Sequence, residues 1–492
     1  MPLPLDFVLA ATGGRLVGPR PGAPFTAVTT DSRAVPAGSL FVALAGERFD
    51  GHTFVPAARA AGAAAALVWA PAAGSLALGL PGFPLVAVAD PLAALGDLAA
   101  ARRRREGALT VLAVTGSNGK TTTKEMLAAA VAPLGPMLKT DGNLNNLIGL
   151  PRTLLAMAEG TRVAVLEMGM NRFGEIARLT EIARPDVGVI TNVGPVHLER
   201  LGSLDGVRRA KLELFRRMPA GGTAVVNADD PSLRDGAAGL AVTPLRVALD
   251  GTPGGARASG LPVDVLARAG ATTPEGRTPL TLETPAGRVR VDLPAEGRHQ
   301  AMNAALAAAA ALAAGVALPE IARGLERFTP VPGRFERVRL EGDVVVVNDA
   351  YNANPASMAA SLEVFCAAPL GPGGRRLAAL GEMRELGEAS AAAHRDLGRR
   401  VAALPLDGVF VYGPSAELVV AGAREAGAPD GRVVALETHE AIADAIAARL
   451  VPGSAVFVKG SRGVTMERVI AALERRRPRL DTMPAGRPGA RS

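Results

Sequence analysis

Residues 109–123 combine three features in a fixed order: an apolar strand, a glycine-rich loop and the start of a helix. The run Leu109–Val114 leads into Thr115-Gly116-Ser117-Asn118-Gly119-Lys120-Thr121, and a helix is expected from Thr121. Such a loop closes backbone N–H groups around phosphate oxygens at the positive end of a helix dipole. The lysine neutralises the β- and γ-phosphates, and the threonine hydroxyl can bind Mg²⁺. An ordinary glycine-rich turn is the competing interpretation, but the order of strand, loop, Lys-Thr and helix disfavours it.

The spacing inside this loop narrows the class of nucleotide-binding protein. Only Ser117 and Asn118 separate its two glycines, whereas the standard Walker A pattern, G-x-x-x-x-G-K-[ST], has a longer run between them. This departure argues against GTPases and ordinary ATPases. The predicted phosphate-binding residues are Gly116, Ser117, Asn118, Gly119, Lys120, Thr121 and Thr122.

The chain of 492 residues is too long for one ordinary core. Short β-branched runs alternate with alanine-rich stretches throughout, which predicts an α/β fold with largely parallel sheets. The segment Thr329-Pro330-Val331-Pro332-Gly333 interrupts both periodicities and is interpreted as a linker. We therefore expect three domains: a smaller α/β domain at 1–107, a central P-loop ATPase-type parallel sheet at 108–329 and a Rossmann-like domain at 330–475, with a disordered tail at 476–492.

The expected strands are short and mostly β-branched. Ahead of the linker they are Ser39–Leu44, Ala64–Trp69, Leu85–Val88, Leu109–Val114, Val163–Leu166, Val187–Thr191 and Thr223–Val226, with a hairpin of Leu280–Glu283 and Val289–Asp292. After the linker they are Val344–Val347, Leu377–Leu380, Gly408–Tyr412, Val433–Leu436 and Ala455–Val458, each followed by a helical stretch, which is a doubly wound pattern. Helices are expected at Pro91–Arg105 and Val207–Arg217.

Charge and cysteine content limit the partners and the compartment. The formal charge of +7 and a pI near 10.2 suggest nucleic acid, but the runs Arg102–Arg105 and Arg475–Arg477 lack aromatic neighbours for base stacking. We therefore expect no nucleic-acid partner. Cys366 is the single cysteine, which excludes an intramolecular disulfide and favours a buried thiol. The longest apolar run, Ala304–Leu318, is too short to span a bilayer, so we expect a cytoplasmic protein without membrane insertion. Separately, we expect a monomer.

Polar residues follow two further strands of the predicted central sheet, at the edge where ligands of parallel sheets bind. Glu167 ends the strand Val163–Leu166, where its carboxylate can hold a hard cation. His197 follows Val187–Thr191. A lone histidine is usually structural, and His197 is a candidate functional residue only because it follows a strand of the same sheet as the phosphate loop and Glu167. Lys211 lies on the succeeding helix among apolar residues, and a surface lysine is the plain alternative.

Together these residues resemble the Mur ligase family of peptidoglycan synthesis. The short phosphate loop, Glu167, His197 and Lys211 carry the resemblance in the central domain. Further matching stretches are Asp31-Ser32-Arg33, Leu40 to His52, Gly142 to Gly149, Gly333-Arg334-Phe335, Asp349-Ala350-Tyr351-Asn352-Ala353-Asn354-Pro355, Gly381-Glu382-Met383-Arg384-Glu385-Leu386-Gly387 and Lys459-Gly460-Ser461-Arg462. The resemblance implies an ATP-dependent ligase that joins D-alanyl-D-alanine to UDP-N-acetylmuramoyl-tripeptide through an acyl phosphate.

The resemblance also implies the cofactors, ATP and two Mg²⁺ ions. Thr121 and the triphosphate would hold one ion, and Glu167, His197 and Lys211 would hold the other. In the family, the lysine at the position of Lys211 is carbamylated, which turns a cation into a carboxylate-like ligand. Together with Lys120, these three residues form the implied catalytic set.

Contacts with the nucleotide and the substrates follow from the same resemblance. Asn303, Arg334 and Asp349 would contact the adenosine moiety, although the chain has His299-Gln300 where the family usually has His-Asn. The implied substrate-binding residues are Ser32, Asp50 and His52 for the uridine diphosphate, Asn143, Asn145 and Asn146 near the phosphates, and Tyr351, Asn352, Lys459 and Arg462 for the dipeptide. The asparagines fit a polar turn equally well, and Lys459 and Arg462 fit equally as loop anchors in ion pairs. Closure of the domains about the linker at 329–333 is expected.

Two other classes of protein stay open at this point. Folylpolyglutamate synthase shares the short loop and the carbamylated lysine, but those enzymes begin close to their phosphate loop, whereas a whole predicted domain precedes it here. A nucleic-acid-binding P-loop protein is suggested by the pI alone.

Overall fold

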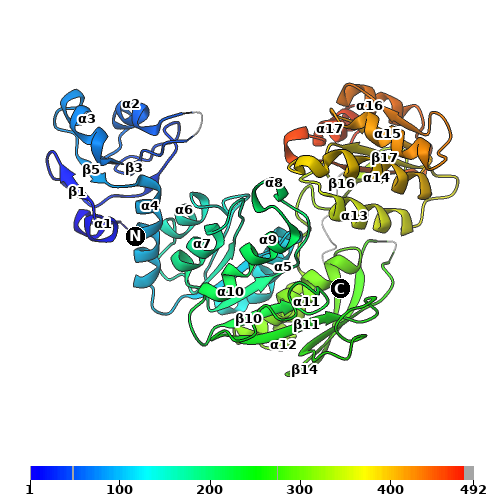
Figure 1. The fold of residues 1–492 in the computed structure, drawn as a ribbon, viewed down its shortest axis with the longest axis horizontal. Coiled ribbons are helices and arrows are strands. Elements are labelled where there is room, and N and C mark those ends of the chain that lie inside the picture. The colour runs from blue at the N-terminus through cyan, green and yellow to red at the C-terminus, as the bar shows by residue number, and fades with distance from the viewer. Residues whose placement is uncertain (1, 47–48, 274, 481–492) are drawn as a thin grey trace, which may run out of the picture.

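Three separate sheets organise the chain. The structure, a computed structural model, describes residues 2–46, 49–273 and 275–480. In Figure 1 the N-terminal domain (blue) and the C-terminal domain (yellow to red) lie on opposite sides above the central domain (cyan to green). The mixed α/β architecture with three sheets confirms the predicted fold class.

The N-terminal domain is a five-stranded sheet in the order β1-β5-β4-β3-β2, with β1 antiparallel to β5 and the other pairs parallel. Apolar side chains of β3, β4 and β5 are buried on both faces of the sheet. Asp90 starts the last helix, because its carboxylate accepts hydrogen bonds from Leu92 N and Ala93 N ahead of a proline-led first turn. The elements are α1 (Leu5–Thr12), β1 (Arg15–Val17), β2 (Val28–Thr29), β3 (Leu40–Val42), η1 (Gly51–Phe54), α2 (Val55–Ala60), β4 (Ala65–Trp69), η2 (Ala70–Ala72), α3 (Ala73–Gly79), β5 (Leu85–Val88) and α4 (Pro91–Arg105).

The central domain is a nine-stranded sheet in the order β14-β13-β12-β11-β10-β9-β6-β8-β7. The strands from β7 to β12 are parallel, and β13 and β14 form the antiparallel hairpin expected from the sequence. Helices cover both faces, with α5, α11 and α12 on one and α6, α7, α9 and α10 on the other. The elements are β6 (Thr110–Thr115), α5 (Lys120–Val131), η3 (Ala132–Leu134), β7 (Met137–Lys139), α6 (Gly149–Leu155), β8 (Val163–Glu167), α7 (Glu175–Ala183), β9 (Val187–Ile190), α8 (Leu198–Leu201), α9 (Leu204–Lys211), α10 (Glu213–Arg217), β10 (Thr223–Asn227), β11 (Thr243–Leu249), β12 (Val265–Ala269), β13 (Thr278–Thr284), β14 (Gly287–Leu293), α11 (Arg298–Ala313) and α12 (Leu318–Glu326).

The C-terminal domain is a six-stranded sheet in the order β15-β16-β20-β17-β18-β19. Only the β15–β16 pair is antiparallel, and the remaining strands form the doubly wound arrangement expected from the sequence. The elements are β15 (Glu336–Leu340), β16 (Val344–Asp349), α13 (Pro355–Ala367), β17 (Arg376–Gly381), η4 (Gly387–Ala389), α14 (Ser390–Ala403), β18 (Gly408–Tyr412), α15 (Ala416–Glu425), β19 (Val433–Ala435), α16 (His439–Ala447), β20 (Ala455–Lys459), η5 (Arg462–Val464) and α17 (Glu467–Arg476).

Two details differ from the sequence-based expectations. The helix expected at 207–217 is two helices, because α9 ends at Lys211 and α10 begins at Glu213. At the other end, α17 runs into the predicted tail, and Leu480 N donates to Arg339 O at 3.0 Å, so residues 478–480 follow β15. The rest of that tail, residues 481–492, lies outside the described residues. Within the described part of the chain, every helix is too short or too polar to cross a membrane.

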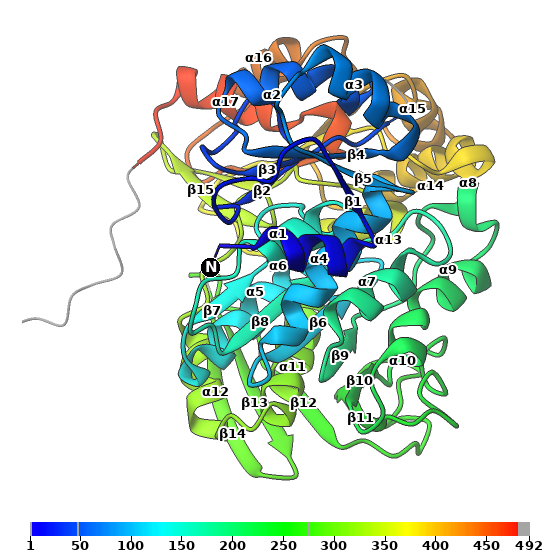
Figure 2. The same ribbon diagram turned by 90° about the vertical axis from the view of Figure 1, so that its left-hand side faces the viewer.

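Figure 2 views the molecule from the side of the N-terminal domain, with α1 and α4 in front of the central sheet. In that sheet β6 lies between β8 and β9, and all three strands are parallel. Their carboxyl ends therefore meet at one edge. The phosphate loop (residues 115–121), Glu167 and the segment 191–194 follow these strands, so the topology brings them together.

Candidate functional site

The first half of the phosphate loop is bound to the segment that follows β9. Ser117 N donates to Asn192 O at 2.9 Å, and Asn118 N donates to Asn192 Oδ1 at 3.0 Å. Ser117 Oγ both accepts from Gly194 N at 2.8 Å and donates to Gly194 O at 3.1 Å. The N–H groups of Ser117 and Asn118 are therefore already used, whereas those from Gly119 into the first turn of α5 are positioned to face a phosphate.

The two glycines of the loop are required by close packing. Gly116 has φ 150°, and a β-carbon there would overlap Thr191 Oγ1. Gly119 has φ 80°, and its β-carbon would lie 2.5 Å from Asn303 Oδ1. Asn303 therefore lies against the loop, while its Nδ2 donates to Gln300 Oε1 at 2.9 Å. The amide oxygen of Gln300 is thus used within α11.

Lys120 folds back over its own loop. Its Nζ donates to Gly116 O at 2.8 Å and to Ser117 O at 3.3 Å. Desolvation lowers the pKa of Lys120, and the nearby guanidinium of Arg334 lowers it further, whereas the carboxylate of Glu167 opposes this shift. A phosphate group would supply the anionic partner that this lysine needs.

Glu167 offers a free oxygen at the buried end of β8. Its side chain is 2% exposed, and Oε1 accepts from Asn145 Nδ2 at 2.8 Å. Oε2 is buried without a hydrogen-bond partner. Leaving a buried carboxylate oxygen unpaired is unfavourable, so its presence beside Lys120 indicates that a cation completes the site.

Lys211 is not a solvated surface residue. It is 2% exposed, and no hydrogen bond or ion pair joins it to any other described residue. Desolvation lowers its pKa well below the ordinary value, and the charge of Lys120 lowers it further. The plain alternative of a solvated lysine is therefore excluded by its burial.

His197 faces the C-terminal domain. It has φ 53°, in the left-handed region, and its Nδ1 lies 2.9 Å from Glu385 Oε2. The two residues line a cavity of about 90 Å³ together with Asn171, Glu199 and Arg200. A metal-binding histidine usually donates its other ring N–H to a carboxylate, so this contact leaves Nε2 free in the orientation typical of a ligand.

These residues fit the implied metal ions in part. Thr121 Oγ1 accepts from Arg334 Nη2 at 3.0 Å, so an ion on this hydroxyl requires the guanidinium to move. The unpartnered oxygen of Glu167 and the free nitrogen of His197 are suitable ligand atoms. Among the described residues, no three His, Cys, Asp or Glu side chains gather as a ready-made metal cluster.

Arg334 reaches the phosphate loop from the third domain and is stacked on Tyr351. The guanidinium carbon of Arg334 lies 4.0 Å from the centroid of the Tyr351 ring, a cation–π contact that holds the guanidinium toward Thr121. Arg462 approaches the same ring at 5.6 Å and is otherwise exposed. This aromatic ring and its two cations are suited to contact a nucleotide or an anionic substrate.

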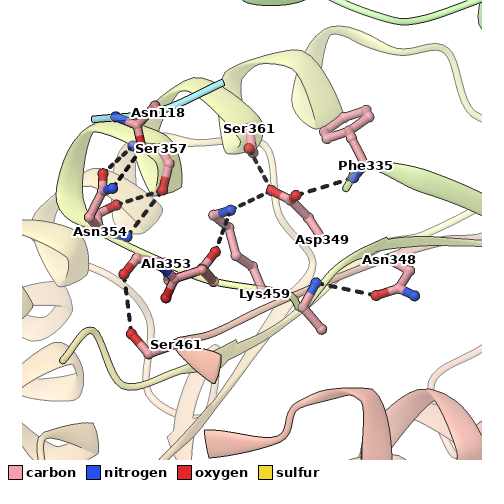
Figure 3. Close-up of polar contacts among 12 residues, drawn as sticks. Asn118, Phe335, Asn348, Asp349, Ala353, Asn354, Ser357, Ser361, Lys459 and Ser461 are labelled. Atoms are coloured by element: carbon pink, nitrogen blue, oxygen red, sulfur yellow. Dashed lines mark hydrogen bonds and ion pairs between the residues drawn. The ribbon is translucent and has the colours of Figure 1, made fainter. Parts of the chain in front are cut away.

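Asp349 and Lys459 form a buried ion pair inside the C-terminal domain. They are direct partners on the parallel strands β16 and β20, and Lys459 Nζ lies 2.5 Å from Asp349 Oδ2 (Figure 3). Asp349 also accepts from Phe335 N at 3.1 Å and Ser361 Oγ at 2.7 Å. Lys459 is 3% exposed and donates to Asn352 O at 3.0 Å. Of the two interpretations of Lys459, the structure describes the loop anchor.

In the N-terminal domain, His52 has no free ring nitrogen. Its Nδ1 lies 2.6 Å from Asp50 Oδ1, and its Nε2 accepts from Trp69 N at 2.9 Å. Hydrogen bonds from the backbone and ring of His52 lower the pKa of Asp50. These residues shape the loop that begins at Gly46, of which 47–48 lie outside the described residues. Ser32 is partly exposed beside the Asp31–Arg33 ion pair.

The asparagines at 143–146 divide into different roles. Asn145 holds Glu167, and Asn146 Oδ1 accepts from Ile148 N at 3.1 Å and Gly149 N at 2.9 Å, which starts α6. Asn143 is exposed. Sequence reasoning missed the contacts of Asn354 with Asn118 and of Glu385 with His197, although both residues lie in stretches that had been singled out.

Comparison with known proteins gives matches along almost the whole chain. The model of the Mur ligase family, catalytic domain, matches residues 24–103, that of the Mur ligase middle domain matches 114–311, and that of the Mur ligase, glutamate ligase domain, matches 333–462. The UDP-N-acetylmuramoyl-tripeptide–D-alanyl-D-alanine ligase of Escherichia coli K12 is 39% identical over 91% of this chain and 93% of that protein. The enzyme of the same name from Bacillus subtilis 168 is 35% identical over 91% and 92%.

Solved structures agree with these matches. A crystal structure of MurF from Acinetobacter baumannii superposes with a TM-score of 0.85 at 34% identity and covers 96% of this chain and 99% of that one. MurF ligase from Thermotoga maritima in complex with ADP superposes with a TM-score of 0.76 at 31% identity, over 91% and 97%.

Proposed function

This chain belongs to the Mur ligase family, and from that premise we propose that it joins D-alanyl-D-alanine to UDP-N-acetylmuramoyl-tripeptide with hydrolysis of ATP to ADP and phosphate. The observation that carries the proposal is the phosphate loop, whose Lys120 lies near both Glu167, with its unpartnered Oε2, and the guanidinium of Arg334. Folylpolyglutamate synthase, the alternative considered from the sequence, is not favoured: a solved FolC is 20% identical, a likeness in fold alone.

The reaction must replace a poor leaving group. The terminal carboxylate of the tripeptide takes the γ-phosphoryl group of ATP and becomes an acyl phosphate, with ADP released from the phosphorus. The amine of D-alanyl-D-alanine then attacks the acyl carbon, loses a proton and expels inorganic phosphate, which leaves the new amide bond. The protein acts mainly by alignment and by neutralising charge on the phosphoryl oxygens.

The residues around the phosphate loop would bind the phosphates, the metal ions and the two substrates. Backbone N–H groups from Gly119 onward and the amine of Lys120 bind the phosphates, while Arg334 adds positive charge from the third domain. Glu167, His197 and Thr121 would hold two Mg²⁺ ions, which supply Lewis acidity at the phosphoryl oxygens. Tyr351 and Arg462 face the same space and would contact the incoming dipeptide. Ser32 and the loop shaped by Asp50 and His52 would bind the uridine diphosphate.

The last metal ligand would be a carbamate on Lys211. The neutral amine attacks carbon dioxide, one proton leaves, and the product carries a carboxylate-like negative charge. Burial favours this step, because desolvation lowers the pKa of the Lys211 amine, and the nearby charge of Lys120 would stabilise the anion that forms. The modified residue would then complete the ligand set that Glu167 and His197 begin.

Substitution of Lys211 tests the carbamate. We expect Lys211→Ala to lose turnover and to regain part of it when short carboxylic acids are added, because the acid replaces the missing ligand. A second measurement needs no turnover: in buffer with ¹³C-labelled bicarbonate, the wild type should give a carbamate carbon signal in NMR that Lys211→Ala lacks. Identical spectra of the two proteins would remove the carbamate from the mechanism.

A phosphate-release assay tests the overall function. Release should require ATP, the uridine-linked tripeptide and D-alanyl-D-alanine together, and omission of any one should reduce it to background. Running the assay with tripeptides ending in meso-diaminopimelate or in lysine identifies the acceptor. Release stimulated instead by a folate with glutamate, or by DNA, would overturn the proposal.

A further inference from the structure

Asn354 joins the C-terminal domain to the phosphate loop. Its Nδ2 donates to Asn118 Oδ1 at 2.6 Å, and the residue is 8% exposed. The same side chain caps α13, because Oδ1 accepts from Ser357 N at 2.9 Å (Figure 3). One amide therefore starts a helix in its own domain and binds the central domain.

Capping alone does not require asparagine at this position. Ser, Thr, Asp and Asn all cap helices well, since each offers an oxygen to the first turn. Asparagine alone among them also carries side-chain N–H donors. Here one of those donors is used by Asn118, so the additional bond accounts for the choice of residue.

The backbone and the side chain of Asn118 are held by different domains. In the central domain, Thr191 Oγ1 donates to Asn118 O at 2.5 Å, and Asn192 Nδ2 donates to the same oxygen at 3.1 Å. The side chain of Asn118 has Asn354 as its one recorded partner among the described residues. The next residue, Gly119, makes the left-handed turn into α5. The side-chain bond thus acts at the bend where the phosphate-facing donors begin.

The loop that carries Asn354 is braced within its own domain. Ser461 Oγ donates to Ala353 O at 3.1 Å, and Lys459 Nζ donates to Asn352 O at 3.0 Å. Both donors come from the end of β20 and the segment after it. The position of Asn354 therefore follows the position of the whole C-terminal domain.

We propose that Asn354 is a positioning residue that couples docking of the C-terminal domain to the nucleotide-binding form of the phosphate loop, through its bond to Asn118. This inference rests on the proposed function, because the nucleotide is taken to bind at that loop. A nucleotide held from both domains selects the docked arrangement. Without the asparagine pair (Asn118 and Asn354) that arrangement is less populated, and the apparent nucleotide affinity falls in proportion.

Two substitutions at one position separate the cap from the interdomain bond. Asn354→Ser keeps a capping oxygen but is too short to reach Asn118, whereas Asn354→Ala loses both functions. We expect both variants to bind ADP about fivefold more weakly in calorimetry, the change that corresponds to one neutral hydrogen bond. Only Asn354→Ala should lower the thermal midpoint. Thr438→Ala is the matched control, because Thr438 caps α16 away from this contact, and it should lower the midpoint without changing ADP affinity.

Substitution of Asn118 provides a second test of the interdomain hydrogen bond. Asn118→Ser should weaken ADP binding by a similar factor, and the double variant Asn118→Ser/Asn354→Ser should be no weaker than either single variant, since one bond is lost in all three. The affinity for the uridine-linked substrate should not change in Asn354→Ser. Unchanged ADP affinity in Asn354→Ser, or losses that multiply in the double variant, would overturn the inference.

Hydrogen exchange without nucleotide distinguishes this inference from the proposed function. The amides of Ser117 and Asn118 are hydrogen-bonded to Asn192 and should exchange faster in Asn354→Ser than in the wild type or Thr438→Ala. If the wild type binds no ADP, the proposed function fails, and the exchange comparison still decides the coupling. Equal exchange rates in these three proteins would reject it.

Discussion

The N-terminal and C-terminal domains contact the central domain through different chemistry. On the N-terminal side, α4 leaves its own sheet and lies against α6 and α7 (Figures 1 and 2). Leu95 and Leu98 of α4 belong to the N-terminal core, whereas Ala99 and Ala100 of the same helix belong to the central core. One helix is thus buried in two cores, and this apolar contact is supplemented by hydrogen bonds from Arg178 to Asp97 and from Arg103 to Ala183 O.

On the C-terminal side the recorded contacts are polar. Arg334 binds Thr121, Asn354 binds Asn118, and His197 pairs with Glu385. Arg337 adds a two-pronged ion pair with Glu296. Within the described residues, no core cluster contains side chains of both the central and the C-terminal domain.

This difference indicates which domain moves. Opening an apolar contact exposes surface that water does not solvate favourably. Opening a polar contact exchanges protein hydrogen bonds for hydrogen bonds to water, at a small net change in free energy. We therefore expect the N-terminal and central domains to move together, and the C-terminal domain to open and close about the linker at 329–333.

The largest expected effect comes from the buried ion pair of Lys459 and Asp349, which braces the part of the C-terminal domain that makes the polar contacts. Lys459→Met leaves Asp349 buried without its cation, and we expect a loss of about 3–5 kcal/mol in the stability of the C-terminal domain. Hydrogen exchange in β16 and β20 during a urea titration measures it. The single tryptophan, Trp69, reports the N-terminal domain and should unfold at an unchanged urea concentration.

A surface ion pair in the same domain is the control for Lys459. Arg476→Met removes an exposed contact with Glu440 and Asp444, where we expect a much smaller loss of stability than in Lys459→Met, because solvent screens the pair. Equal losses of stability in Arg476→Met and Lys459→Met would show that the buried pair of Lys459 and Asp349 does not stabilise the C-terminal domain more than a surface pair does. A shift of the Trp69 transition in Lys459→Met would show that the outer domains are not independent.

A smaller effect is expected at the apolar contact. Gly96 of α4 faces α7 so closely that a β-carbon would lie 2.9 Å from both Arg178 Nη2 and Ile182 Cδ1. Gly96→Leu should overpack the contact and destabilise the chain by about 1–3 kcal/mol, seen in the Trp69 urea transition. Gly96→Ala is the matched control with a smaller loss, because the two atoms it meets are the ends of flexible side chains. Equal stability of Gly96→Leu and the wild type would remove the argument that this contact is tightly packed.

The sequence was sufficient for the elements that position the site. Short apolar runs placed β6, β8 and β9, and their parallel pairing brings the phosphate loop, Glu167 and the segment after β9 to one edge. β15 was missed, because its alternating Glu-Arg-Val-Arg-Leu pattern is half polar and adjoins the linker. The break of the 207–217 helix at Leu212 was also missed, since helical periodicity continues across it.

Contacts between domains could not be predicted from the sequence. Asn118 and Asn354 are 236 residues apart, and no periodicity relates them. Burial of Lys211 depends on the packing of α9 rather than on its immediate neighbours, which is why composition alone favoured a surface lysine. Pairing of Lys459 with Asp349 follows from the register of β16 and β20, which strand patterns alone do not fix.

The smallest expected effect concerns the exposed pair of His197 and Glu385. We expect Glu385→Gln to weaken docking of the C-terminal domain by less than about 1 kcal/mol, because solvent screens a pair of which Glu385 is 64% exposed. Small-angle scattering should detect this as a slight expansion at low salt. High salt should expand the wild type more than the variant, because screening weakens the His197–Glu385 pair in addition to the Arg337–Glu296 pair that both proteins keep.

The pH dependence of this pair has a definite sign. The hydrogen bond from His197 lowers the pKa of Glu385. The contribution of this pair to domain docking is therefore fully present above the ordinary carboxyl pKa, and it is lost as the pH falls through the lowered pKa of Glu385. Acidification should therefore expand the wild type more than Glu385→Gln, with the N-terminal contact as an internal reference because α4 buries apolar side chains there. If acidification expands both proteins equally, groups other than His197 and Glu385 determine the pH dependence of the contact between the C-terminal and central domains.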